Sequence, residues 1–136
     1  DEVSTIDGIR CESMPLQNIQ TYAHLDIFVD GKTQQVPAGI GVVNNTCRYW
    51  MYTQDMTGII HINSPENAQF TISQFFDIWK ATSNLPPTGI PIIYLNGQKT
   101  SSSMNDTEIN PHDEIAIIYG SKPAIIPSSY QFLTSS

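Results

Sequence analysis

The chain has 136 residues, of which 40% are hydrophobic and 14% charged, so it can form one domain with its own core but hardly two. Thirteen acidic residues against six basic ones leave a formal net charge of −7. Partners that are themselves polyanions would be repelled, so we expect no nucleic-acid binding. No apolar run approaches the length of about 18 residues that a membrane-spanning helix needs, so we expect no membrane insertion.

Two cysteines, Cys11 and Cys47, lack the close spacing of a metal or redox motif. Together with a polar composition rich in Ser, Thr, Asn and Gln, they predict one disulfide and a secreted, extracellular or cell-surface protein. The acidic first residues indicate a mature product without its signal peptide. Asn44 and Asn105 each begin an Asn-x-Thr triplet in an expected loop, which makes both candidate sites for N-glycans.

Residues 1–21 are polar and aperiodic, and we expect them to form an N-terminal arm held by the disulfide. From Ala23 onward apolar and polar residues alternate, which predicts a half-buried strand. His24 and Asp26 fall on its polar face.

An Asp-Gly turn then predicts a hairpin whose second strand spans 33–43 and is interrupted at 37–39, where we expect a bend or bulge. A second hairpin is predicted over 48–63, with its turn at 55–58.

One helix is predicted over 71–80, because Thr71 and Gln74 form a capping-box pair at its start. Its bulky residues recur at the spacing of a single helical face, which we expect to pack into the core rather than to hold a cofactor. This face consists of Ile72, Phe75, Phe76 and Trp79.

Beyond the helix, three prolines within 84–91 predict a stiff crossover. Strands are predicted over 92–95 and 114–120, and the remaining tail, 123–136, is rich in Pro and Ser.

This order of elements is expected of an α+β fold of the β-grasp type, in which a mixed sheet wraps one helix. The domain would span 22–122, with the hairpin of 48–63 as an insertion, and a plain α+β sandwich is the alternative. The stretch NPHDEIAIIYG resembles the last turn and strand of ubiquitin-like and sulfur-carrier-like β-grasp proteins. Their C-terminal Gly-Gly is missing, so the resemblance does not imply carrier chemistry.

Motifs for an enzyme or a cofactor are missing from the sequence. Gly39 and Gly41 are not followed by a helix whose first turn could face a phosphate. There is no Gly-x-Ser-x-Gly motif, and the histidines are too scattered to indicate a nucleophile with its base. We therefore expect a non-enzymatic protein without a cofactor.

The best candidate constellation surrounds the second hairpin. If its turn has four residues, Tyr52 lies opposite His61 on one face, and a third strand could bring His24 near. Such histidines with carboxylate help could hold copper or zinc weakly. The alternative is that they are surface histidines that only make hydrogen bonds.

Three stretches carry a resemblance to a known family: HLDIFVDGKTQQVPAGIGV, CRYWMYTQDMTGIIHINSP and FTISQFFDIWK. Over roughly residues 9–120 the chain resembles a widespread, uncharacterised secreted or membrane-anchored domain of bacteria and archaea. That family commonly has a His-Thr-His-Asp hairpin where this chain reads Tyr-Thr-Gln-Asp, and often a further histidine before the position of His24. The resemblance therefore implies that only His24, Asp55 and His61 remain as ligands, so that copper or zinc would bind weakly at most.

Our leading expectation is a secreted structural module that assembles with copies of itself into an extracellular fibre or coat. Few lysines protect the sheet edges, so the polar arm or the tail of a neighbour could add there as a strand. The alternatives are a weak metal-binding or small-ligand-binding extracellular or periplasmic protein, an enzyme of a type that no motif identifies, and a monomer whose ends pack on their own domain.

Overall fold

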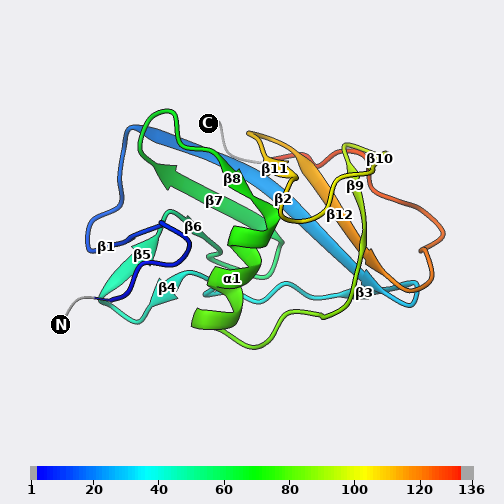
Figure 1. The fold of residues 1–136 in the computed structure, drawn as a ribbon, viewed down its shortest axis with the longest axis horizontal. Helices are drawn as coiled ribbons and strands as arrows, with labels where there is room; N and C mark the ends of the chain where they lie inside the picture. Colours follow the sequence, from blue (N-terminus) through cyan, green and yellow to red (C-terminus); the bar gives the residue numbers. More distant parts are fainter. Residues whose placement is uncertain (1–2, 133–136) are drawn as a thin grey trace.

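The computed structural model describes residues 3–132. Its elements form a small α+β protein with mixed sheets and one helix (Figure 1). In chain order they are β1 (Cys11–Glu12), β2 (Ile19–Val29), β3 (Lys32–Gln34), β4 (Val42–Val43), β5 (Cys47–Tyr49), β6 (Met51–Tyr52), β7 (Ile59–Ser64), β8 (Phe70–Thr71), α1 (Ile72–Thr82), β9 (Ile92–Leu95), β10 (Gln98–Thr100), β11 (Glu108–Ile109) and β12 (Glu114–Tyr119).

A seven-stranded sheet in the order β10-β9-β12-β2-β7-β6 organises the molecule, with β3 also paired to β2. Strand β2, with 11 residues, runs the length of the sheet between β12 and β7, and Figure 1 shows it in blue. Its first half pairs antiparallel with β7, its last residues pair with β3, and β12 lies parallel to it. Within the second hairpin, β6 and β7 therefore belong to the main sheet, where β7 lies directly beside β2, whereas β5 lies outside it.

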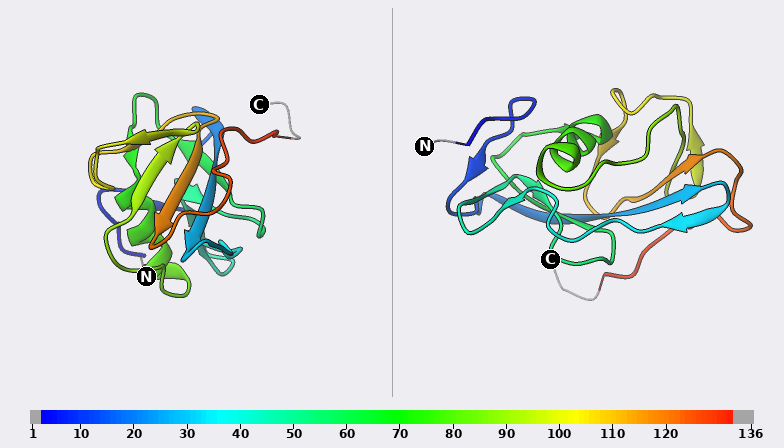
Figure 2. Two further views of the ribbon diagram at one scale, coloured as in Figure 1. Left: turned by 90° about the vertical axis from the view of Figure 1, so that its right-hand side faces the viewer. Right: turned by 90° about the horizontal axis from the view of Figure 1, so that it is seen from below.

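One face of this sheet packs against α1, and the C-terminal residues cross the other face (Figure 2, right). The helix has the expected start: the Thr71 hydroxyl accepts from the Gln74 amide, and the Gln74 side chain accepts from the Thr71 amide. The predicted aromatic face is confirmed as core, since Ile72, Phe75, Phe76 and Trp79 are all at most 5% exposed. At 11 residues α1 is too short to span a bilayer, and no helix within 3–132 meets the length and apolarity needed.

The predicted disulfide is confirmed: Cys11 and Cys47 are bonded, with their Cα atoms 5.3 Å apart. Strand β1 pairs with β5, so part of the arm belongs to a second sheet, in the order β1-β5-β4. Ile9, at 1% exposed, even enters the main core. The arm is thus more ordered than its polar, aperiodic sequence indicated.

Two predicted strand boundaries were wrong. Strand β2 begins at Ile19 rather than at Ala23, because pairing with β7 orders residues whose exposed side chains show no alternation. The second strand of the first hairpin ends at Gln34 rather than at residue 43, because the expected interruption is a full break and β4 belongs to the other sheet. Glycines at positive φ after Pro37 turn the chain away between them.

Candidate metal centre

His24 lies in the middle of the main sheet, with β7 on one side of its strand and β12 on the other. It was expected on a polar face, but it is only 4% exposed. The alternation of β2 correctly separated two faces, yet the outer face is covered by the C-terminal residues, and the ring of Tyr130 stacks on the imidazole at 3.6 Å. The reading of His24 as a surface histidine was therefore wrong.

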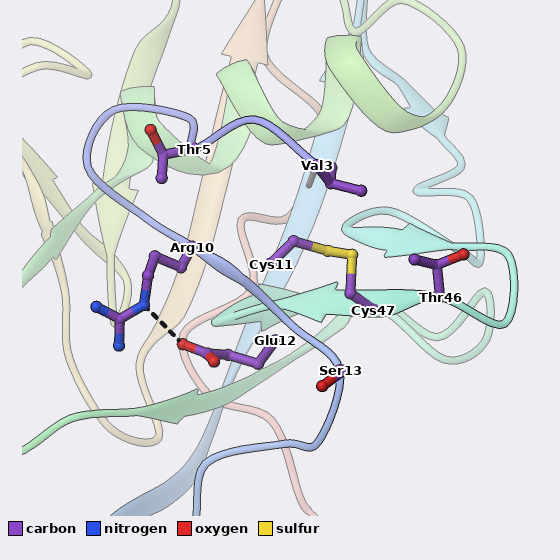
Figure 3. Close-up of a pocket in the computed structure, with 8 residues that line it drawn as sticks. All are labelled: Val3, Thr5, Arg10, Cys11, Glu12, Ser13, Thr46 and Cys47. Atoms are coloured by element: carbon purple, nitrogen blue, oxygen red, sulfur yellow. Dashed lines mark hydrogen bonds and ion pairs between the residues drawn. A yellow bond between two sulfur atoms is a disulfide. The ribbon is translucent and has the colours of Figure 1, made fainter. Parts of the chain in front are cut away.

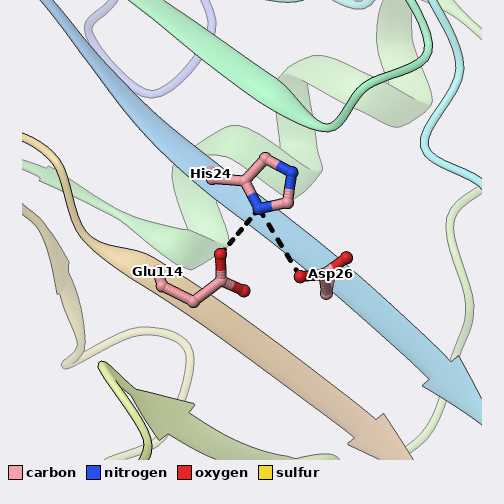
Figure 4. Close-up of side chains that lie close together, drawn as sticks. All are labelled: His24, Asp26 and Glu114. Atoms are coloured by element: carbon pink, nitrogen blue, oxygen red, sulfur yellow. Dashed lines mark hydrogen bonds and ion pairs between the residues drawn. The ribbon is translucent and has the colours of Figure 1, made fainter. Parts of the chain in front are cut away.

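Glu114 is brought to His24 by the parallel pairing of β12 with β2, in which these two residues are directly in register. Their side chains meet on the outer face, where His24 Nδ1 and Glu114 Oε1 lie 2.7 Å apart (Figure 4). Asp26, two residues along β2, projects to the same face and places Oδ2 3.5 Å from the same nitrogen. The three ligand atoms all lie within 4.8 Å of one another.

The second imidazole nitrogen has its own partner. Nε2 lies 2.6 Å from the carbonyl oxygen of Thr57, which can only accept, so Nε2 carries a proton. This contact depends on the next residue, Gly58, at φ +88°: a Cβ there would lie 2.4 Å from the Leu25 carbonyl oxygen and 3.0 Å from Nε2. Nδ1 is thereby the nitrogen left to face the two carboxylates.

The electrostatics of Glu114 are unusual. Its side chain is 0% exposed, and its second oxygen, Oε2, has no hydrogen-bond partner within the described residues. Burial, with Asp26 close by, raises the pKa of Glu114 to about 8, although the contact with His24 opposes the rise. Burial lowers the pKa of His24, but the hydrogen bond and charge of Glu114, with Asp26, outweigh it, so that pKa is raised. At neutral pH the cluster therefore holds its protons more tightly than the same groups would in water.

The two other residues of the expected ligand set lie elsewhere. The predicted pairing of Tyr52 with His61 is confirmed by the register of β6 and β7, and their rings stack at 5.2 Å. Burial lowers the pKa of His61. Asp55 accepts hydrogen bonds from the amide and hydroxyl of Thr57, and these lower its pKa. Within 3–132, neither His61 nor Asp55 joins His24 in a group of potential ligand atoms.

Asp26 and Glu114 were missed as ligands. Asp26 was noted only as a neighbour of His24. A signal existed for Glu114, because a carboxylate that begins the apolar strand EIAIIY is a candidate buried charge, and such charges are almost always paired. What the sequence does not reveal is which strand lies beside it.

The disulfide borders a separate cavity of about 320 Å³ between the arm and the loop before β5 (Figure 3). Its charged groups already serve the fold: Arg10 donates to Glu12 at 3.0 Å, and the same carboxylate accepts from the Trp50 indole.

The two candidate glycosylation residues, Asn44 and Asn105, are both exposed. Neither lies at the His24 cluster.

No family model, no curated protein and no solved structure matches the chain, so no activity, ligand or partner comes to it from a relative. The resemblance to a secreted domain family accordingly stays a prediction.

Proposed function

We propose that the protein binds a divalent transition-metal ion such as Zn²⁺ between His24, Asp26 and Glu114. The observation that carries this proposal is the fully buried Glu114 carboxylate, which lies beside a second carboxylate and whose Oε2 has no hydrogen-bond partner among the described residues. Two carboxylates brought together under a covered sheet face are unfavourable without a cation or retained protons. A divalent ion would replace those protons and neutralise both charges.

The geometry suits such an ion with small adjustments. Ligands about 2.1 Å from a tetrahedral zinc lie about 3.4 Å from one another. The 3.5 Å between His24 Nδ1 and Asp26 Oδ2 already matches this spacing. The 2.7 Å contact to Glu114 must lengthen when the shared proton leaves, and the Asp26 and Glu114 oxygens already lie within 4.8 Å of each other.

The surroundings of His24 also suit a ligand. Metal-binding histidines usually donate their other N–H to a carbonyl or carboxylate, as Nε2 does here to Thr57. The Asp26 side chain is 27% exposed, so the cluster borders solvent on that side. A water molecule could complete a four-coordinate site there.

Calorimetry on the metal-free full chain tests the proposal. We expect one Zn²⁺ per chain, with affinity reduced at least about tenfold in Asp26→Asn and Glu114→Gln. His61→Ala is the matched control, because it removes an imidazole outside the cluster, and it should bind zinc as the wild type does.

Unchanged zinc binding in Glu114→Gln would refute the site. Loss of binding in His61→Ala would instead support the set inferred from the sequence, His24, Asp55 and His61. The present proposal differs from the sequence-based expectation of weak binding because Asp26 and Glu114 add two ligands that the expectation did not count.

We further propose that the main sheet is a β-grasp variant in an extracellular protein. The parallel central pair β2/β12, with β9 and β10 beyond β12, supports the fold assignment. The disulfide supports the location. The exposure of Asn44 and Asn105 is compatible with N-glycans, which a mass shift on deglycosylation of the native protein would reveal.

Self-assembly into a fibre or coat is a second proposal. It is favoured by β10, which pairs only with β9 and leaves one edge of the main sheet without a strand among the described residues. The arm and the tail are less suited to joining copies, because Ile9 and Tyr130 pack on their own domain. Light scattering and electron microscopy at high protein concentration test this proposal, and a protein that stays monomeric refutes it.

A further inference from the structure

The C-terminal residues 126–132 form a cover over the outer face of the main sheet. Ile126 packs against a small apolar cluster made by Phe28, Ala116 and Ile118. Further along, Tyr130 meets His24, and Phe132 lies against the rings of Tyr22 and His112. Figure 2 (right) shows this segment on the side of the sheet away from α1.

The contact of Tyr130 with His24 is a parallel stack, with ring centroids 3.6 Å apart and planes inclined by 9°. Both imidazole nitrogens direct their bonds in the ring plane, toward Glu114 and Thr57. Tyr130 occupies the ring face instead. Stacking and coordination of an ion at Nδ1 can therefore occur together.

The cover is held more weakly than the strands beneath it. No hydrogen bond joins residues 121–132 to the rest of the described chain, so apolar and ring contacts hold the segment. Pro123 and Pro127 lack amide hydrogens and cannot donate one. Such a segment can open without unfolding the sheet.

We infer that residues 126–132 act as a lid whose closing is coupled to metal occupancy, with Tyr130 as the positioning residue. This inference rests on the proposed metal function. Where the metal-free imidazole is neutral, an ion bound at Nδ1 makes it positive, and a positive ring attracts the electron-rich face of a tyrosine more strongly than a neutral one. Because coupling is reciprocal, the lid strengthens metal binding by the same factor by which the metal strengthens closing.

Zinc titration of the full chain tests the coupling. We expect Tyr130→Leu to weaken Zn²⁺ binding roughly 5-fold, the size of one cation–π contact, and Tyr130→Phe to restore it. Tyr94→Leu is the matched control, because Tyr94 packs against the same apolar cluster as Ile126 and makes no ring contact with His24 among the described residues. It should leave zinc affinity unchanged.

The reciprocal effect is measured as the rate of chymotrypsin cleavage after Tyr130. Saturating Zn²⁺ should slow this cleavage roughly 5-fold in the wild type and leave it unchanged in Asp26→Asn. If the wild type binds zinc and Tyr130→Leu binds it equally well, the lid is refuted while the site stands. If Tyr130→Phe is as weak as Tyr130→Leu, ring stacking is refuted as the cause. If the wild type binds no zinc, the metal function fails and the coupling with it.

Discussion

Replacing Glu114 with glutamine should change how the stability of the metal-free protein depends on pH. Burial raises the pKa of Glu114 to about 8, against 4.5 in the unfolded chain. Between these values the folded protein keeps a proton that the unfolded chain releases, so the free energy of unfolding falls as pH rises. The fall is at most about 5 kcal/mol over the interval, at about 1.4 kcal/mol for each pH unit. His24, whose pKa is also raised, acts in the same direction, because its contribution is present below its unfolded pKa and is lost at higher pH.

Glutamine has the shape of glutamate, can donate to Nδ1 of a neutral His24, and does not ionise. Between pH 5 and pH 8, we expect the free energy of unfolding of Glu114→Gln to rise by about 2 to 5 kcal/mol relative to that of the wild type. Urea melts with a chelator present, followed by the fluorescence of the buried tryptophans, measure this gain. Glu66→Gln, at an exposed position, is the control that should follow the wild type. Parallel pH profiles for wild type and Glu114→Gln would refute the assignment of a buried, protonated carboxyl.

Three further predictions concern the framework around the centre. Trp79→Ala should cost about 3 to 5 kcal/mol in urea melts, because it leaves a cavity at a side chain 1% exposed, and a loss below about 1 kcal/mol would contradict its core role. Gly58→Ala should destabilise the protein by about 1 to 3 kcal/mol more than Gly39→Ala, since both glycines have φ +88° but only at Gly58 would the new Cβ clash with backbone, and equal losses would refute that clash. Reducing the bond between Cys11 and Cys47 should lower the free energy of unfolding by about 3 to 4 kcal/mol, and freely alkylated thiols in the native protein would disprove the bond.

Local signals were enough to predict several elements correctly. The capping box and the spacing of the aromatic residues located α1 to within two residues at its end. Alternation identified which face of β2 is apolar. These features depend on residues that are close in sequence, so the sequence by itself determined them.

The candidate centre depends on pairings between residues far apart in the chain. His24 and Glu114 are separated by 90 positions, and only the parallel register of β12 with β2 brings them together. Tyr130, whose ring covers one face of His24, reaches it from the C-terminal segment. Alternation reports that two faces differ, but not what covers each of them. The sequence therefore determined the helix, the apolar face and the disulfide pair, whereas the tertiary structure decided the ligand set, because strand order and the covering of a sheet face are not local properties.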